Sequence, residues 1–341
     1  MTVQNISPGN HNKVFITGGT GFLGAYIIKE LIGKGYKVRA IRRTNKIPFF
    51  IPVSFLDKID WIQGDILDIN SLEEGMDGVD AVIHAAAKVS FLPKERKEMY
   101  KINIEGTANV VNMAMEKRIG RLIHVSSVAA LGRSGNNDNV NEGKQWEESK
   151  FHTHYAVSKY RGEMEVWRAI AEGLNAVIIN PSTVLGFGDW NNTSCAIFKS
   201  MYNEFPWYTN GVNGFVDVTD IAKLVTLLLE SDIAAERFLI SGENWSFRKL
   251  FDNIADGFSK KRPSREANAF LGGIAWRLEK IKSFFKGSEP VLTKESAKIA
   301  QSKTYFDNHK IREYFPDFRF TPLEQSIQQS CKAYLQHLNG R

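Results

Sequence analysis

The residues best suited to acid–base chemistry are a tyrosine and a lysine four positions apart, Tyr155 and Lys159. At this spacing both side chains lie on one face of a helix, so the lysine ammonium can stand beside the phenol. A free phenol has a pKa near 10, and lowering it by about three units needs roughly 4 kcal/mol of differential stabilisation. Lys159 and a second positive group in a poorly solvated site could supply this energy, and Tyr155 would then exchange protons near neutral pH.

Ser127 adds a hydroxyl that could hydrogen-bond a substrate oxygen. It directly follows the apolar run from Leu122 to Ser126, which we expect to be a strand. Two other interpretations stay open. A tyrosine and a lysine at this spacing also occur by chance on exposed helices, and a serine at a strand end can simply cap the backbone.

Short β-branched runs alternate along the chain with candidate helices. This alternation predicts an α/β fold with a doubly wound parallel sheet, the Rossmann arrangement. We expect strands at 14–17, 37–41, 60–62, 81–85, 122–126 and 176–180, and helices at 21–32, 71–76, 94–117 and 155–172. After Pro181 the alternation gives way to mixed segments, although residues 214–241 again have a strand, helix, strand pattern. We therefore expect a smaller, discontinuous substrate domain.

A glycine-rich stretch, residues 17–24 (TGGTGFLG), joins the first expected strand to the first expected helix. Gly18, Gly21 and Gly24 would allow a tight turn, close approach of the backbone to a pyrophosphate, and packing of the helix on the strand. The helix N-terminus would then offer free N–H groups and the positive end of its dipole to the phosphates. A dinucleotide is the implied ligand, although three glycines in seven residues also occur in ordinary turns.

The second expected strand ends at Arg42 and Arg43, where a dinucleotide site selects the adenosine ribose. An acidic residue there would repel a 2′-phosphate, whereas a guanidinium can grip it with two parallel hydrogen bonds. This favours NADP over NAD; the alternative is a solvated strand end. The next strand leads to Asp65 and Ile66, which places a carboxylate near the expected adenine amino group. Asp65 could equally cap the following helix.

Composition narrows the class of protein. The 341 residues are 43% hydrophobic and 24% charged, which is typical of a globular protein. We expect a cytoplasmic protein, since no apolar run reaches membrane-spanning length and residues 1–10 form a polar leader unlike a signal peptide. The only two cysteines, Cys195 and Cys331, argue against disulfides and a cysteine metal site, and we expect no metal.

The net charge of +6 is concentrated in one segment, because residues 260–286 hold eight basic and two acidic residues. The rest of the chain is neutral, which argues against a nucleic-acid partner. Within that segment, apolar residues recur every three or four positions over 262–286, as in basic amphipathic helices that can lie on anionic membranes. We favour a helix of the substrate domain, so membrane association is not expected.

Together these motifs resemble the extended branch of the short-chain dehydrogenase/reductase family, the NAD-dependent epimerase/dehydratase superfamily. The likeness rests on motifs in the family's order at 17–24, 64–66, 84–87, 103–107, 124–127, 155–159, 180–186 and 215–220. It implies that Tyr155 is the acid/base, Lys159 binds the nicotinamide ribose, Ser127 positions the substrate oxygen and Asn103 completes a proton relay. The oxidised nicotinamide would be the second positive group near Tyr155. The residues expected at the cofactor are Gly18, Thr20, Gly21, Phe22, Leu23, Gly24, Arg42, Arg43, Asp65, Ile66, Ala85, Ala86, Ala87, Lys159, Pro181, Thr183 and Val184.

Within the family, residues 38–43 (VRAIRR) are similar to the dihydroflavonol reductase and cinnamoyl-CoA reductase group, whose arginine matching Arg42 holds the 2′-phosphate of NADP. The resemblance thus implies an NADP-dependent oxidoreductase that interconverts a small-molecule ketone or aldehyde and its alcohol. An NAD-dependent nucleotide-sugar epimerase is the alternative. Ala129 stands where such epimerases usually carry Ser or Thr, and the acidic pair of sugar dehydratases is missing after Ser127. Asn180 stands where the family motif usually has arginine.

The resemblance also suggests how the chain is divided and assembled. We expect a dinucleotide-binding Rossmann domain at 11–181 plus 214–241, and a substrate-binding domain at 182–213 plus 242–338. Many extended members dimerise by packing the helices that match 94–117 and 155–172 into a four-helix bundle, so a homodimer is expected. The later domain and the loop 133–152 would select the substrate.

Overall fold

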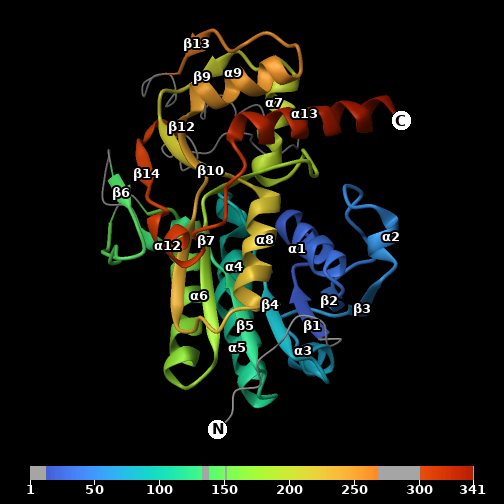
Figure 1. Ribbon diagram of the computed structural model, residues 1–341. Coiled ribbons are helices and arrows are strands. Elements are labelled where there is room, and N and C mark those ends of the chain that lie inside the picture. The colour runs from blue at the N-terminus through green and yellow to red at the C-terminus, as the bar shows by residue number, and fades with distance from the viewer. Residues whose placement is uncertain (1–12, 133–137, 150–151, 268–299, 341) are drawn as a thin grey trace.

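Seven parallel strands form the central sheet, in the order β11-β7-β5-β4-β1-β2-β3 (Figure 1). The computed structural model describes residues 13–132, 138–149, 152–267 and 300–340. The strands are β1 Lys13–Thr17, β2 Lys37–Arg42, β3 Ile59–Gln63, β4 Ala81–His84, β5 Arg121–Val125, β7 Ala176–Pro181 and β11 Glu236–Ile240. The predicted doubly wound parallel sheet is confirmed, and its strand order reverses direction between β1 and β4.

Helices cover both faces of this sheet. One face carries α1 Phe22–Gly33 and α8 Val218–Leu229, and the other carries α3 Ile69–Met76, α5 Gly106–Glu116 and α6 His154–Ala171. Successive strand residues point to opposite faces. Val14 and Ile16 therefore pack in the first apolar layer, and Phe15 between them packs in the second. The continuous apolar strands follow from burial on both sides.

The expected helix at 94–117 is interrupted in the middle. It begins as a 3₁₀ turn, Pro93–Glu95, continues as α4 Arg96–Tyr100, widens to a π-helical turn at Lys101–Glu105 and ends as α5. Asn103 lies in that turn, and its side chain bonds the backbone of Lys88 at both N–H and C=O, 2.8 and 2.9 Å away. These bonds stabilise the wider turn, a placement that periodicity alone does not indicate.

A second lobe lies beyond one end of the sheet and consists of later segments (Figure 1). Its small sheet has the order β12-β10-β8, with β8 Thr183–Leu185, β10 Val212–Asp217 and β12 Glu243–Ser246. Helices α7 Ala196–Tyr202, α9 Phe247–Gly257 and α13 Leu323–Asn339 pack on it through a separate apolar cluster. β10 thus pairs in the small sheet, while α8 and β11 complete the large fold. The domain boundaries themselves stay a prediction.

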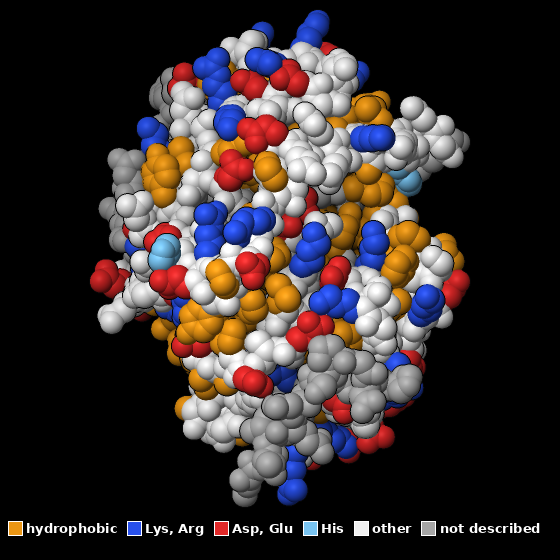
Figure 2. Space-filling model, viewed as in Figure 1, with side chains coloured by type: hydrophobic (Ala, Val, Ile, Leu, Met, Phe, Trp, Pro, Cys, Tyr) orange, Lys and Arg blue, Asp and Glu red, His pale blue; other side chains and the backbone are white. Residues whose placement is uncertain are grey.

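Short elements complete the structure: α2 Val53–Leu56, β6 Asp138–Val140 paired with β14 Thr304–Phe306, β9 Trp207–Tyr208 paired with β13 Arg265–Glu266, and α12 His309–Tyr314. The polar leader 1–10 and most of the basic segment 262–286 lie outside the described residues. On the face in Figure 2, basic and acidic side chains are interspersed rather than segregated. Among the described residues, no helix combines the length and the apolarity that a membrane span requires.

Candidate active site

The residues predicted to bind a cofactor follow the carboxyl ends of five parallel strands. Because these ends meet at one edge of the sheet, segments far apart in sequence converge there. Residues 18–24 follow β1, residue 42 ends β2 and residue 43 follows it, residues 65 and 66 follow β3, residues 85–87 follow β4, and residues 181–184 span the end of β7 and the start of β8. Ser127 follows β5 at the same edge.

The glycine turn at the end of β1 has no room for side chains. Gly18 has φ +74°, and a Cβ there would lie 2.6 Å from the Ala86 nitrogen. A Cβ on Gly24 would lie 2.2 Å from the Gly18 oxygen, so helix α1 packs directly on the turn. Gly21 is the N-cap of α1, and no side chain caps the N–H groups of the helix. This bare helix start fits the pyrophosphate of a dinucleotide.

Hydrogen bonds join the ends of β1 and β4 beneath the glycine turn. The Thr17 hydroxyl lies 2.7 Å from His84 Nδ1 and accepts the Ala86 N–H at 3.2 Å. The other ring nitrogen of His84 lies 3.0 Å from the Thr107 hydroxyl. Burial lowers the pKa of His84 to about 3, with the Lys159 charge as a smaller cause, so this imidazole is neutral. It is a structural link and does not transfer protons near neutral pH.

The arginine predicted to select the cofactor lies against an aromatic ring. The guanidinium carbon of Arg42 stands 5.2 Å from the centre of the Trp61 ring on β3. Arg43 is exposed. Asp65 accepts the Leu67 N–H at 2.9 Å, but the N-cap of α3 is Asp68. The helix-capping interpretation of Asp65 is therefore wrong, and its contact with adenine stays a prediction.

Tyr155, in the first turn of α6, meets Ser127 across the end of β5. Burial raises the pKa of the Tyr155 phenol, and a hydrogen bond with Ser127 opposes the increase. The Ser127 oxygen also accepts the Ala129 N–H at 3.2 Å, so the capping interpretation holds together with the contact to Tyr155. Lys159 is not among the causes that lower this pKa. In the protein alone the phenol therefore keeps its proton.

Lys159 lies one helical turn after Tyr155 and is almost fully buried, with 3% of its surface exposed. Its Nζ donates to the Val125 carbonyl at the end of β5, 3.1 Å away. Burial lowers the pKa of Lys159 to about 8, and the charge of Glu163 opposes this decrease. The group therefore titrates far closer to neutrality than an ordinary lysine does.

Asn103 lies next to α6. Among the described residues, no hydrogen bond joins it to Tyr155 or Lys159. Its amide nitrogen donates to the Ser158 hydroxyl and to the Lys88 carbonyl, each at 2.9 Å. Its backbone carbonyl accepts the Thr107 hydroxyl at 2.8 Å. The predicted relay through Asn103 stays a prediction.

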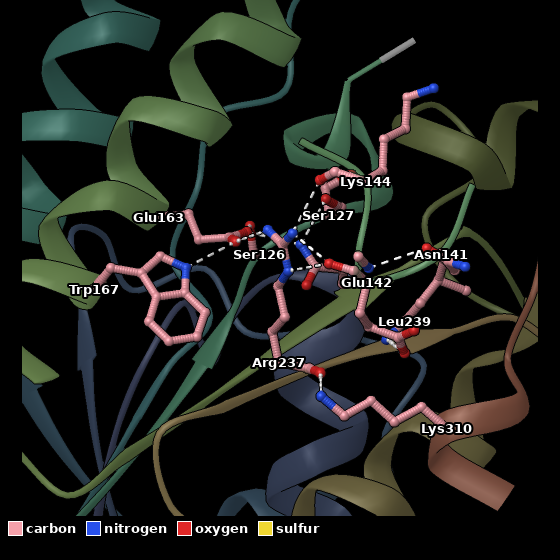
Figure 3. A network of polar contacts seen from close by, with 12 residues as sticks. Ser126, Ser127, Asn141, Glu142, Lys144, Glu163, Trp167, Arg237, Leu239 and Lys310 are labelled. Carbon is pink, nitrogen blue, oxygen red and sulfur yellow. Dashed lines mark hydrogen bonds and ion pairs between the residues drawn. The ribbon is translucent and has the colours of Figure 1, made fainter. Parts of the chain in front are cut away.

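Several residues of this region were not predicted from the sequence. Buried Glu163 pairs with the partly buried Arg237 and bonds Ser126 (Figure 3), and it also accepts a hydrogen bond from buried Asn180. Phe91, from the segment after β4, stands edge-on to Tyr155 with ring centres 6.0 Å apart. The one available signal was the spacing of Tyr155, Lys159 and Glu163, which places all three on one helix face. Among the described residues, no three metal-ligating side chains cluster to hold an ion.

Comparison with known proteins identifies the family. The model of the NAD dependent epimerase/dehydratase family matches residues 14–241, two thirds of the chain. This chain belongs to the NAD-dependent epimerase/dehydratase family. It is accordingly an NAD(P)-dependent oxidoreductase, and the resemblance seen in the sequence is confirmed.

Similar members of this family include reductases. A putative dihydroflavonol 4-reductase of Synechocystis is 31% identical over 303 residues, 87% of either chain. Cinnamoyl-CoA reductase 1 of Petunia hybrida is 31% identical over 240 residues, covering 66% of this chain and 71% of its own. The crystal structure of gox2253 matches with a TM-score of 0.79 at 27% identity, over 96% of this chain and 99% of that one. A UDP-glucose 4-epimerase of Thermotoga maritima shares the fold, with a TM-score of 0.76 at 18% identity over 96% and 98%.

Proposed function

We propose that this member of the family is an NADP-dependent enzyme that reduces a ketone or aldehyde or, in reverse, oxidises the alcohol. The observation that carries the proposal is the contact between the Ser127 and Tyr155 hydroxyls, with buried Lys159 one helical turn away. Two hydroxyls beside a cation can hold a carbonyl oxygen and deliver a proton to it.

In the reductive direction each residue has one task. Tyr155 donates its phenolic proton to the substrate oxygen, and the raised pKa of the phenol keeps that proton available until substrate binds. Ser127 orients the same oxygen, since its own oxygen is already engaged by the Ala129 N–H and its hydrogen can be donated. Lys159 stabilises the phenolate that remains. The nicotinamide, when bound, supplies hydride exchange with the substrate carbon.

Support for NADP comes from the end of β2. At that strand end, the guanidinium of Arg42 lies over the aromatic ring of Trp61. A ring behind a guanidinium restricts its motion, and a restricted guanidinium binds a 2′-phosphate at lower entropic cost. Similar solved structures carry NAD, so the preference for the phosphorylated form belongs to the proposal rather than to the family.

The surroundings of Tyr155 favour a substrate with apolar bulk. The Phe91 ring stands edge-on to the Tyr155 phenol, with ring centres 6.0 Å apart. Ligand sites lined by aromatic side chains favour apolar ligands. We therefore propose a hydrophobic small-molecule carbonyl compound, with no nucleic acid and no membrane as partner, and a cytoplasmic homodimer as the working assembly.

The test is an assay of NADPH oxidation with purified protein. We expect consumption of NADPH, and much slower consumption of NADH, with at least one aldehyde or ketone of a broad panel, or formation of NADPH from NADP⁺ with a hydroxysteroid. No change in NADPH absorbance with any of them would contradict the proposal. Interconversion of UDP-sugars by protein that retains tightly bound NAD would establish the epimerase alternative instead.

A further inference from the structure

A buried carboxylate, Glu163, lies beneath the candidate catalytic residues and has a role in none of the steps above. It is 2% exposed and sits one helical turn after Lys159 on α6. Four side chains donate to it, of which Ser126, Trp167 and Arg237 are labelled in Figure 3. Its Oε2 accepts the Ser126 hydroxyl at 2.6 Å and Asn180 Nδ2 at 2.7 Å, and its Oε1 accepts Arg237 Nη1 at 3.2 Å and Trp167 Nε1 at 3.3 Å.

Two of these bonds reach the residue that positions the substrate oxygen. Ser126 directly precedes Ser127, so its bond to Glu163 fixes the start of that turn. Asn180 Nδ2, while bound to Glu163, also donates to the Ser127 carbonyl at 3.0 Å. The backbone of Ser127 is thus held at two points by groups that Glu163 anchors. A shift of about 1 Å in such a residue can cost a hundredfold in rate.

The same carboxylate acts electrostatically on Lys159, one helical turn before it on α6, and Tyr155 lies one turn before the lysine. Two imidazoles of the sheet also lie within electrostatic reach of the lysine, His84 on β4 and His124 on β5. Burial lowers the pKa of both histidines, with Lys159 as a smaller cause, so they are neutral and offer no counter-charge. Burial lowers the pKa of Lys159, and the negative charge of Glu163 opposes this decrease.

Arg237, on the edge strand β11, holds the far side of the carboxylate. Its Nε and Nη2 donate to the Glu142 carbonyl at 2.9 and 2.5 Å, and Nη2 also reaches the Lys144 carbonyl at 3.1 Å. The guanidinium is therefore engaged on both sides and cannot rotate freely. This arrangement orients Glu163 and leaves its Oε2 turned toward Ser126 and Asn180.

We infer that Glu163 is a positioning residue of this site, which holds Ser127 through Ser126 and Asn180 and provides the negative charge that acts on Lys159. The expected effect of Glu163 on the reaction rate rests on the proposed function. Its effect on the Lys159 ammonium can be measured whether or not a substrate is known.

Glu163→Gln tests the charge, because the amide keeps the size and an acceptor oxygen. The readout is the titration of the Lys159 amine followed by ¹⁵N NMR in protein with labelled lysine side chains, assigned with Lys159→Arg. We expect the pKa of Lys159 to fall by roughly one unit below the wild-type value. Glu165→Gln is the matched control, since Glu165 lies on the same helix, pairs with Arg168 and should leave that pKa unchanged. An unchanged pKa in Glu163→Gln would overturn the inference.

Glu163→Asp tests whether the carboxylate must reach Ser126 and Asn180, and it replaces the glutamine variant if that variant does not fold. Aspartate keeps the charge but is one methylene shorter, so it loses its contacts with Ser126 and Asn180. We expect the pKa of Lys159 to stay within a few tenths of a unit, and kcat of the reductase to fall roughly ten- to hundredfold. Full kcat in this variant would exclude the positioning role. If no variant or wild-type protein reduces any carbonyl, the proposed function fails, while the NMR titration still decides the role of the charge.

Discussion

The guanidinium of Arg42 stacks over the ring of Trp61, 5.2 Å from its centre. Arg42 ends β2 and Trp61 lies on the neighbouring strand β3, so the pairing of these strands creates the contact. It places a partly fixed positive charge where the sheet edge would hold the adenosine ribose of a dinucleotide.

We expect Arg42→Ala to weaken binding of 2′,5′-ADP by about ten- to a hundredfold, since charge-assisted hydrogen bonds contribute roughly 1.5–3 kcal/mol. Trp61→Leu should weaken it less, because the charge remains and only its orientation is lost. Calorimetric titration measures both, and 5′-AMP is the control ligand. Equal losses for 5′-AMP and 2′,5′-ADP would mean that Arg42 does not bind the 2′-phosphate.

Removal of the Tyr155 hydroxyl tests whether this residue is the general acid. Tyr155→Phe should lower kcat by roughly 10²- to 10⁴-fold, the usual contribution of a positioned general acid. Binding of NADPH, followed by fluorescence, should be nearly unchanged because the ring and its contact with Phe91 remain. Retention of more than a tenth of wild-type kcat would assign proton donation to another group.

The buried lysine predicts the alkaline limit of activity. The pKa of Lys159 is lowered to about 8, so the ammonium is present below that pH and is lost as the pH rises through it. We therefore expect kcat/KM for NADPH, which reports the cofactor-free protein, to fall above about pH 8. If kcat/KM falls only near pH 10, Lys159 titrates like an ordinary lysine or has no part in the reaction.

An aromatic contact links the two lobes. Phe49, in the segment after β2, stacks on His337 of α13 with ring centres 4.6 Å apart and meets Phe187 at 6.1 Å. Phe49→Ala should lower the free energy of unfolding by about 1 kcal/mol and speed hydrogen exchange in α13. Val53→Ala, at a more exposed position of the same region, is the control and should change stability by less than about 0.5 kcal/mol. Equal effects would show that the contact contributes no stability.

Both cysteines should be inert in the folded protein. Burial raises the pKa of Cys195 and of Cys331 to about 12, and neither side chain is exposed by more than 1%. The thiolate is the reactive form. We expect iodoacetamide at pH 8 to leave the native protein unmodified while it alkylates both cysteines in guanidinium, as mass spectrometry would detect. Rapid alkylation of the native protein would indicate frequent local opening.

The sequence by itself determined the local features of this protein. The alternation of apolar runs predicted the strands of the large sheet, because strands buried on both faces must be apolar. The glycines at 18 and 24 predicted a turn without room for side chains, because steric limits act within a few residues. The four-residue spacing of Tyr155 and Lys159 placed both on one helix face, because the helical repeat fixes which neighbours along the chain share a face.

Tertiary structure decided what these residues meet. Glu163 bonds Ser126, 37 positions before it, and Arg237, 74 positions after it, because β5 and β11 lie on either side of β7 in the sheet. Strand order is a property of the whole chain, so no local pattern could pair these side chains. The π turn at Asn103 and the stacking of Phe49 on His337 depend likewise on segments brought together by packing. Burial, which only the assembled fold provides, then set the pKa of Lys159 near 8.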